Sequence, residues 1–347
     1  MPVIQDRYGR TFRTLRVSLL NHCNLGCVYC VAGDDAVGKA NNAAAKEHAA
    51  AKEHTASGID LNTLKTKTAH GKHTALSVPD LLTIIERLHG QLRLGTIRLT
   101  GGEPLLYTGL VELIAGIRSI GIPDIKLTTN GFLLERLATP MKDAGMSSIN
   151  VSLDAIEEEV FFRMSQRRGV ERIIRGIDAA RQAGLSVKIN TVVMRGMNDS
   201  QILPLLDFAF SRDLRVRYLE VMAMGHLYET ADRYLFSQKD ILSVIASRYH
   251  FTPLGRTRSA TANYWQTDDG HSFGIIANES QPFCGDCDRL RLDSGGNIYG
   301  CLSSNHPIPL GSEETEMEWS EKLQKALLQK QALRFTGSDL SMLHIGG

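Results

Sequence analysis

The chain has 347 residues, 43% hydrophobic and 22% charged. This composition excludes a disordered chain and suffices for one large domain or two ordinary ones. Its 39 Lys and Arg nearly balance its 38 Asp and Glu, so no overall basic field attracts nucleic acid, and any anionic ligand must be held by a local cluster of cations. The N-terminus lacks the apolar core of a signal peptide, and no segment reaches the ~18 apolar residues of a membrane span, so we expect a cytoplasmic protein.

Strands and helices alternate from residue 13 to about residue 225. Apolar and β-branched runs predict strands at 13–20, 96–100, 124–129, 147–153, 185–193 and 215–222. Helical periodicity is found at 77–92, where Ser77 is the expected N-cap, and at 109–120, 132–144, 157–182 and 199–211. Six such units predict a parallel sheet with helices outside, two units short of a full eightfold barrel, with ligands at the carboxyl ends of the strands.

Two regions depart from this alternation. Residues about 33–75 include the tandem repeat AAAKEH at 43–48 and 49–54, whose composition predicts a solvated, semi-helical or disordered insertion without an apolar face. Residues 226–347 contain shorter and less regular elements. We therefore predict a barrel domain at 1–225 and a smaller C-terminal domain or cap at 226–347.

The six cysteines form two sets of three, one near each end of the sequence. The first triad is C-x3-C-x2-C at Cys23, Cys27 and Cys30, and the second is C-x2-C-x13-C at Cys284, Cys287 and Cys301. This grouping is not that of a disulfide-rich secreted domain, and it favours metal binding in a reducing compartment.

Each triad is one ligand short of the usual four. A [4Fe–4S] cluster held by three thiolates leaves one iron open for a substrate. The alternatives are inert thiols or a zinc site with a histidine as fourth ligand, such as His22 for the first triad and His271 or His306 for the second. Arg289 and Arg291 closely follow the second triad, and guanidinium groups suit phosphates and carboxylates.

The first triad, with Tyr29 just before its last cysteine, resembles the signature of the radical S-adenosylmethionine superfamily. The sequence Gly101-Gly102-Glu103-Pro104, directly after the strand at 96–100, resembles the superfamily's glycine motif. The resemblance implies a [4Fe–4S] cluster on the first triad, S-adenosylmethionine on its open iron, a 5′-deoxyadenosyl radical, and a partial (β/α)6 barrel of TIM type.

Nearly the whole chain resembles the GTP 3′,8-cyclase family of molybdenum cofactor biosynthesis. The matching blocks include FRTLRVSL, CNLGCVYC, IRLTGGEPLL, LTTNG, INVSLDA, VKINTVV, RYLEVM, FCGDCDRLRLDSGGNIYGCL and the terminal glycines. The resemblance implies a second [4Fe–4S] cluster that binds the guanine of GTP. It also implies conversion of GTP and S-adenosylmethionine to 3′,8-cyclo-7,8-dihydroguanosine triphosphate, 5′-deoxyadenosine and methionine.

The same resemblance assigns roles to individual positions. The positions expected at S-adenosylmethionine are Tyr29, Gly102, Ser152 and Met222. Those expected at GTP are Arg16, Arg98, Thr128, Lys188, Arg289, Leu290 and Arg291. The tail Gly346-Gly347 is expected to enter the active site. Read alone, the cations could pair with strand-end carboxylates, Met222 could belong to the core, and the tail could be frayed.

Other expectations concern partners and departures from the family. The resemblance implies an electron donor of reduced flavodoxin or ferredoxin type and a downstream cyclic pyranopterin monophosphate synthase, and a homodimer is plausible by frequency. Thr96 stands where the family often has a basic residue, so one phosphate contact is expected to be weakened or replaced. The rival functions are a peptide-modifying radical enzyme and a non-enzymatic iron–sulfur or zinc protein.

Overall fold

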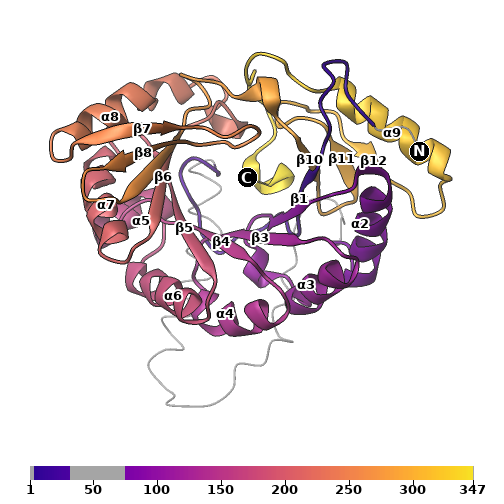
Figure 1. Ribbon diagram of the computed structural model, residues 1–347, viewed down its shortest axis with the longest axis horizontal. Helices are drawn as coiled ribbons and strands as arrows, with labels where there is room; N and C mark the ends of the chain where they lie inside the picture. The colour runs from indigo at the N-terminus through magenta and orange to yellow at the C-terminus, as the bar shows by residue number, and fades with distance from the viewer. Residues whose placement is uncertain (1–3, 32–74, 347) are drawn as a thin grey trace.

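The computed structural model describes residues 4–31 and 75–346. These residues form one twelve-stranded sheet in the order β12-β11-β10-β1-β2-β3-β4-β5-β6-β9-β8-β7, curved and flanked by helices (Figure 1). The sheet does not close, because β12 and β7 remain its two edges, and the prediction of a partial barrel is confirmed. The repeat insertion and Gly347 lie outside the described residues.

The six strands predicted before residue 225 are all present and all parallel. They are β1 Thr14–Ser18, β2 Thr96–Thr100, β3 Asp124–Thr129, β4 Ser148–Ser152, β5 Ser186–Val193 and β6 Arg215–Glu220. The helices among them are α2 Val78–Leu92, α3 Leu110–Ser119, α4 Leu134–Asp143, α5 Glu158–Ser165, α6 Val170–Gln182 and α7 Ile202–Phe210. As predicted, Ser77 caps α2, and its side chain accepts a hydrogen bond from the Asp80 N–H.

The prediction of one helical stretch at 157–182 is wrong, because two helices occupy it. Gln166 adopts a left-handed conformation with φ 57° and ends α5. The Glu158 carboxylate then accepts hydrogen bonds from the N–H groups of Gly169 and Val170 at the start of α6. The continuous apolar periodicity concealed this break, since Gln166 is not a residue that typically marks a helix end.

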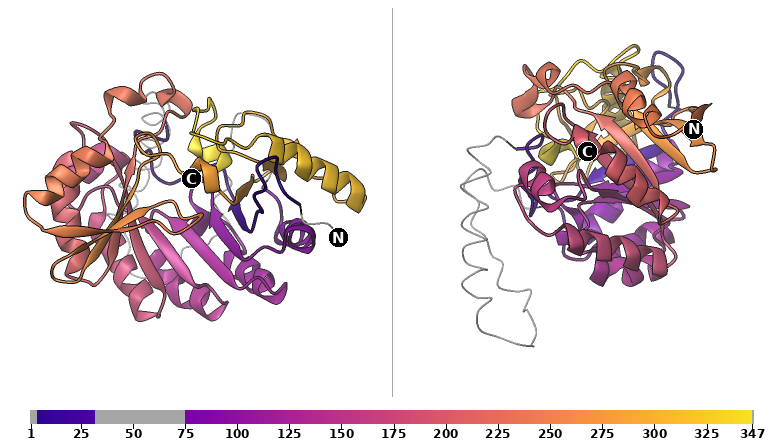
Figure 2. Two further views of the ribbon diagram at one scale, coloured as in Figure 1. Left: turned by 45° about the horizontal axis from the view of Figure 1, so that its top comes forward. Right: turned by 90° about the vertical axis from the view of Figure 1, so that its left-hand side faces the viewer.

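The residues after 226 extend the same sheet at both sides. The strands are β7 Phe251–Gly255, β8 Asn263–Thr267, β9 Ser272–Ile276, β10 Arg289–Leu292, β11 Asn297–Tyr299 and β12 Ile308–Pro309; the helices are α8 Gln238–Ala246, α9 Glu316–Leu328 and α10 Met342–Ile345. β9 pairs parallel with β6, and β10 pairs parallel with β1. The C-terminal segment then turns into the space enclosed by the curved sheet (Figures 1 and 2). No helix within the described ranges is long and apolar enough to cross a membrane.

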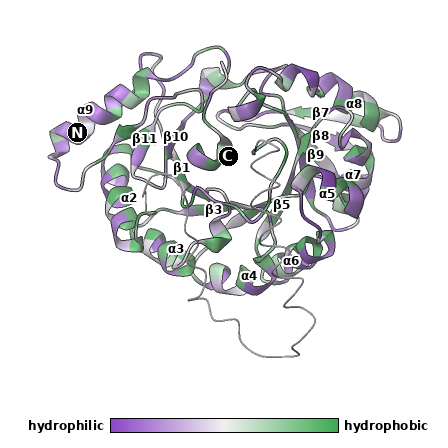
Figure 3. Ribbon diagram, turned by 180° about the vertical axis from the view of Figure 1, so that it is seen from behind, coloured by the Kyte–Doolittle hydropathy of each residue, from purple (hydrophilic) through white to green (hydrophobic). Residues whose placement is uncertain are grey.

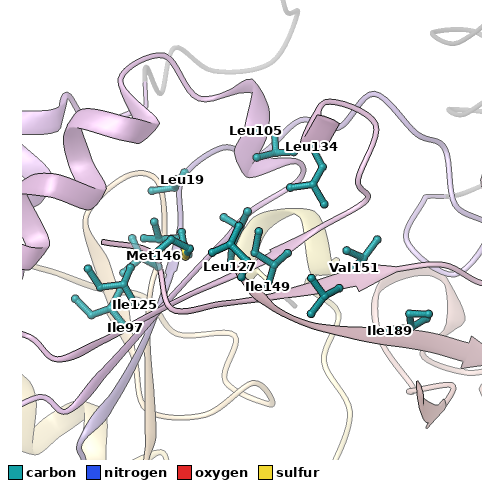
Figure 4. Packing of buried hydrophobic residues seen from close by; sticks show 14 of the residues in the cluster. Leu19, Ile97, Leu105, Ile125, Leu127, Leu134, Met146, Ile149, Val151 and Ile189 are labelled. Atoms are coloured by element: carbon teal, nitrogen blue, oxygen red, sulfur yellow. The ribbon is translucent and has the colours of Figure 1, made fainter. Parts of the chain in front are cut away.

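Alternation along the strands separates an apolar face from a polar one. Ile97, Ile125, Leu127, Ile149 and Val151 are fully buried in the main core between strands and helices (Figure 4). Burial of each such side chain contributes roughly 1.5–3 kcal/mol. The outer helices show hydrophobic and hydrophilic sides (Figure 3). The intervening strand residues are therefore left on the concave face, where polar side chains can meet a ligand.

Candidate active site

The first cysteine triad lies in the loop that follows β1. The N–H groups of Gly26 and Val28 donate to the carbonyls of Ser165 and Met164, each at 2.9 Å, which fixes the loop against the end of α5. The Cys30 N–H donates to the Cys27 carbonyl at 2.8 Å and forms a tight turn. The loop is thus positioned by backbone contacts that leave all three thiols free of disulfides.

The thiols of this triad lie in a buried, electron-rich environment. Burial and then the Glu103 carboxylate raise the pKa of Cys23 to about 11. Burial and then Cys23 raise the pKa of Cys30 to about 12, and burial followed by Cys30 raises that of Cys27. Since nearby thiols oppose one another's ionisation, a positively charged metal centre would stabilise the thiolates. The donor set therefore fits a [4Fe–4S] cluster with one open iron.

The zinc alternative requires three or more ligands around one ion. Within residues 4–31 and 75–346, no group of three His, Cys, Asp or Glu side chains could hold a single metal ion. His271, a candidate ligand of the second triad, instead stacks on the Phe210 ring at 4.7 Å between centroids. In a cubane each thiolate binds a different iron, so the thiols of a triad need not converge on one point.

The glycine motif packs directly on the cysteine loop. A Cβ on Gly102 would lie 2.0 Å from the His22 carbonyl oxygen, so no side chain fits there. The Gly102 N–H donates to Leu20 at 2.7 Å, and the Glu103 N–H donates to His22 at 3.0 Å. The sequence predicted close approach of a ligand here, and the structure adds close approach of the neighbouring loop.

Glu103 and Asn130 connect three strand ends and were missed from the sequence. The buried Glu103 carboxylate accepts hydrogen bonds from the Thr129 hydroxyl at 2.6 Å and from the N–H groups of Asn130 and Leu105 at 2.7 and 2.9 Å. Burial raises the pKa of Glu103 to about 7. The Asn130 amide donates to the Cys23 sulfur at 3.6 Å. Their positions just after β2 and β3 were the available signal.

Tyr29 and Ser152 lie near a further buried carboxylate, Asp154. The Tyr29 hydroxyl donates to Asp154 at 2.7 Å, and the Val192 N–H donates to its other oxygen at 2.9 Å. Burial raises the pKa of Asp154 to about 6. Ser152 ends β4 two residues before Asp154. Met222, by contrast, follows β6 and packs with Met224 and Ile345 beside the C-terminal tail.

Three arginines form a row across adjacent strands on the concave face. Arg16 on β1 is the register partner of Arg291 on β10 and of Arg98 on β2. The Arg16 Nε and the Arg98 Nη1 are buried and have no hydrogen-bond partner among residues 4–31 and 75–346. Burial and then the charge of Arg291 lower the pKa of Arg16 well below its ordinary value, and burial with Arg217 lowers that of Arg98 to about 10. A bound anion would relieve this repulsion.

The concave face carries further cations beyond β2. Burial, followed by Arg217 and Arg215, lowers the pKa of Lys188 on β5 to about 8. Arg217 on β6 is buried and donates to the Asn190 amide oxygen at 2.7 Å, and its Nε has no partner in the part of the chain that the structure describes. Sequence reasoning missed Arg217, although it alternates with core residues in the strand block RYLEVM.

Two predicted GTP positions differ in what they offer a ligand. Thr128 on β3 is half-buried on the concave face. The Leu290 side chain is fully buried in the main core, so only its backbone is available. Leu290 is thus an interior residue between two concave-face arginines.

The second triad lies beside buried cations. Lys330, which is 3% exposed, has its ammonium 3.5 Å from the Cys287 sulfur and also donates to the Arg289 carbonyl. Burial alone would raise the pKa of Cys287, but Lys330 and Arg289 lower it to about 7. Cys284 differs, because burial and then Cys301 raise its pKa to about 11. Lys330 was missed because it is 43 residues from Cys287 in sequence.

The C-terminal tail reaches the row of arginines. The Arg291 guanidinium donates to the carbonyl of Gly346. Gly346 has a φ of 74°, and a Cβ there would lie 2.7 Å from the Thr100 methyl group at the end of β2. The fit requires glycine, so this end of the chain is docked rather than frayed as far as Gly346.

Comparisons with known proteins agree with this geometry. The family described as Radical SAM superfamily matches residues 17–209, and Molybdenum Cofactor Synthesis C matches residues 214–337. Among solved structures, SuiB of Streptococcus suis bound to S-adenosylmethionine is 13% identical with a TM-score of 0.60, covering 92% of this chain and 68% of that chain. Native anSMEcpe with bound AdoMet is also 13% identical, with a TM-score of 0.58 and coverage of 91% and 83%. At this identity the likeness shows the fold.

A partial barrel with a C-x3-C-x2-C loop after its first strand and a glycine loop after its second defines the class of radical S-adenosylmethionine enzymes. A protein of Synechocystis sp. named GTP 3′,8-cyclase is 33% identical over 342 residues, covering 99% of this chain and 94% of the relative. The enzyme of that name from Pseudomonas savastanoi pv. phaseolicola is 32% identical over 341 residues, covering 96% and 92%. Within the radical class, the chain belongs to the GTP 3′,8-cyclase family.

Proposed function

We propose that this chain is a GTP 3′,8-cyclase of molybdenum cofactor biosynthesis. It converts GTP and S-adenosylmethionine to (8S)-3′,8-cyclo-7,8-dihydroguanosine 5′-triphosphate, 5′-deoxyadenosine and methionine. The observation that carries the proposal is the row of Arg291, Arg16 and Arg98 on adjacent strands. Within the described residues, Arg16 and Arg98 each have a buried donor atom without a hydrogen-bond partner. Family membership points to the same reaction.

The residues proposed to hold S-adenosylmethionine lie around the first triad. Gly102 keeps the glycine loop against the cysteine loop, and Tyr29 donates to the buried Asp154. Ser152 ends β4, two residues before Asp154. Met222 contributes an apolar surface next to the tail. When bound, the cluster and S-adenosylmethionine would supply an electron and the 5′-deoxyadenosyl radical. The protein's contribution is placement of the ribose C3′ hydrogen and exclusion of water.

The concave cations are proposed to hold the triphosphate, which carries about four negative charges. Arg16, Arg98 and Lys188 all have a pKa lowered first by burial and then by the charges of neighbouring cations. A phosphate placed among these cations would offset the repulsion between their positive charges. Arg217 joins them from β6, and Thr128 offers a hydroxyl group on β3.

The second triad is proposed to hold a second [4Fe–4S] cluster that binds the guanine. Its cysteines are mutually close, since Cys301 and Cys287 both oppose ionisation of Cys284. Arg289 and the Leu290 backbone adjoin it, and Arg291 links it to the tail through Gly346. We propose that Gly346 and the following Gly347 close the site against water and against other hydrogen donors.

The domain division, the cellular location and the partners of the protein extend the proposal. We propose a functional division at about residue 225, supported by the two separate family matches, and a cytoplasmic location suited to reduced thiols. We also propose a reduced flavodoxin or ferredoxin as electron donor, cyclic pyranopterin monophosphate synthase as the next enzyme, and homodimerisation. No observation favours the peptide-modifying or non-enzymatic alternatives.

The proposed function is tested by anaerobic reconstitution followed by turnover. We expect about eight irons per chain, four for each cubane. With S-adenosylmethionine, GTP and a reductant, the protein should consume GTP and release the cyclic triphosphate product. Formation of 5′-deoxyadenosine without consumption of GTP would contradict the cyclase assignment while leaving the radical class intact.

The variant Arg291→Met sharpens this test. It should reduce use of GTP more than uncoupled cleavage of S-adenosylmethionine, because Arg291 lies on the GTP side of the barrel. A matched control is Arg175→Met, which removes an exposed guanidinium on α6 that pairs with Glu135. Equal loss of both reactions in Arg291→Met would indicate a structural role instead.

A further inference from the structure

The row of cations on the concave face continues onto β3. Lys126 is the register partner of Arg98, which is itself the partner of Arg16. Neighbouring strands lie about 4.8 Å apart, so partners on one face are in reach of the same small ligand. Like charges directly opposite one another destabilise a sheet. Four adjacent strands, β10, β1, β2 and β3, therefore present cations at one level, which is unfavourable without an anion.

The direction of the Lys126 side chain follows from its neighbours. Ile125 and Leu127 are fully buried in the main core, so Lys126 lies on the opposite, concave face. Its charge is one of those that lower the pKa of Lys188, together with Arg98. Lys126, Arg98 and Lys188 thus face the same space from β3, β2 and β5.

An ion pair with Asp124 holds the ammonium of Lys126. Its Nζ lies 2.5 Å from the Asp124 carboxylate, and the two side chains are 28% and 34% exposed. Asp124 also accepts hydrogen bonds from the hydroxyl groups of Ser147 at 2.6 Å and Thr96 at 3.3 Å. These two donors remain when the ammonium moves, so Asp124 can release or share Lys126 without becoming unsatisfied.

We propose that Lys126 is an additional phosphate-binding residue of the GTP site. Its ammonium shifts from Asp124 toward the β- or γ-phosphate and binds it together with Arg98. This inference rests on the proposed function. The flexible four-carbon stem of lysine allows this movement, and an ammonium is a point charge suited to phosphate oxygens.

The test measures nucleotide affinity by calorimetry on the reconstituted protein. We compare the wild-type protein with Lys126→Met, Lys126→Arg and a control, Lys142→Met. Lys142 lies on α4, and its exposed ammonium donates to the Gly184 carbonyl. Loss of one phosphate contact should raise the Kd for GTP about tenfold in Lys126→Met, equivalent to about 1.4 kcal/mol. The Kd for GMP should change less than about twofold, and Lys126→Arg should retain most of the affinity for GTP.

Asp124→Asn separates a ligand role from a structural one. If Lys126 binds phosphate, removing the competing carboxylate charge should leave GTP affinity equal or higher, opposite to the effect of Lys126→Met. If the ion pair only supports the strand, both variants should weaken binding alike, and the proposal is wrong. If Lys126→Met folds poorly, the GTP affinity of Asp124→Asn still tests whether Lys126 binds phosphate.

The remaining outcomes divide between the two proposals. Wild-type affinity for GTP in Lys126→Met, or equal losses for GTP and GMP, would refute the role of Lys126 while the cyclase assignment stands. Failure of the reconstituted wild-type protein to bind GTP would overturn both.

Discussion

The two cysteine triads have the same number of thiols but opposite electrostatic surroundings. The first faces the buried carboxylates Glu103 and Asp154, and the pKa values of its thiols are all raised. The second faces Lys330 and Arg289, which lower the pKa of Cys287 to about 7. The count of ligands is set by the sequence motif, whereas the surrounding charge is set by distant parts of the chain.

This difference bears on the chemistry of the two proposed clusters. Negative charge around an iron–sulfur cluster disfavours its reduction, whereas hydrogen bonds to the sulfur atoms or nearby positive charge favour its reduction. The first site is therefore suited to a strongly reducing centre, which cleavage of a sulfonium requires. The second site, with Lys330 and Arg289 beside Cys287, is suited to a centre that accepts an electron more readily than the first.

The largest expected effect comes from removing one thiol from each triad. Cys30→Ala should abolish both formation of 5′-deoxyadenosine and use of GTP, each by at least about 1,000-fold, or ~4 kcal/mol. Cys301→Ala should abolish use of GTP to a similar extent but retain uncoupled 5′-deoxyadenosine formation. Chromatography of both products provides the measurement. Identical profiles for the two variants would show that the triads do not divide the reaction as proposed.

A smaller effect is expected in thiol reactivity of the cluster-free protein. All six cysteine residues have intermediate exposure, so the difference in ionisation should dominate their relative rates. With pKa values of about 7 for Cys287 and about 12 for Cys30, the thiolate fraction at pH 8 favours Cys287 by about 10,000-fold. The lower nucleophilicity of the more acidic thiol reduces this to about 30- to 100-fold.

Iodoacetamide labelling followed by peptide mass spectrometry measures these rates. Because a depressed pKa shifts ionisation to lower pH, labelling of Cys287 should rise through pH 7, whereas Cys30 should still be increasing above pH 10. Comparable rates at pH 8 would show that the two triads do not differ in their electrostatic surroundings.

The repeating part of the fold could be predicted from the sequence. Each of the six parallel strands has an alternating or apolar pattern of five to eight residues, and the helices have clear periodicity. The C-terminal strands are harder, since β11 has three residues and β12 has two. The C-terminal strands join opposite sides of the sheet through two long-range pairings, β10 with β1 and β9 with β6. No local sequence pattern encodes such pairings.

The candidate site was predictable where chemistry is concentrated in short motifs. The cysteine spacing and the glycine loop identified both triads and the neighbouring loop. Asp154 contacts Tyr29 across 125 residues of sequence, and Arg10, which donates to the Cys284 carbonyl, does so across 274. Such partners become visible only when the register of the sheet brings their strands together.

The smallest expected effect comes from removing the Lys330 ammonium, a positive charge that distinguishes the surroundings of the second triad from those of the first. Lys330→Met removes an ammonium 3.5 Å from the Cys287 sulfur, so the pKa of Cys287 should rise from about 7 toward its ordinary value of 9.0. At pH 6, labelling of Cys287 in the cluster-free protein should slow about tenfold after allowing for the greater nucleophilicity of the less acidic thiol. Lys330→Arg keeps the positive charge and should stay near the wild-type rate, whereas labelling of Cys30 should not change in either variant. The Lys330 ammonium also lies 4.9 Å from the centre of the Phe12 ring. If Lys330→Met and Lys330→Arg slow labelling of Cys287 equally, Lys330 acts by packing against Phe12 rather than by its charge. The electrostatic difference between the triads would then rest on Arg289 alone.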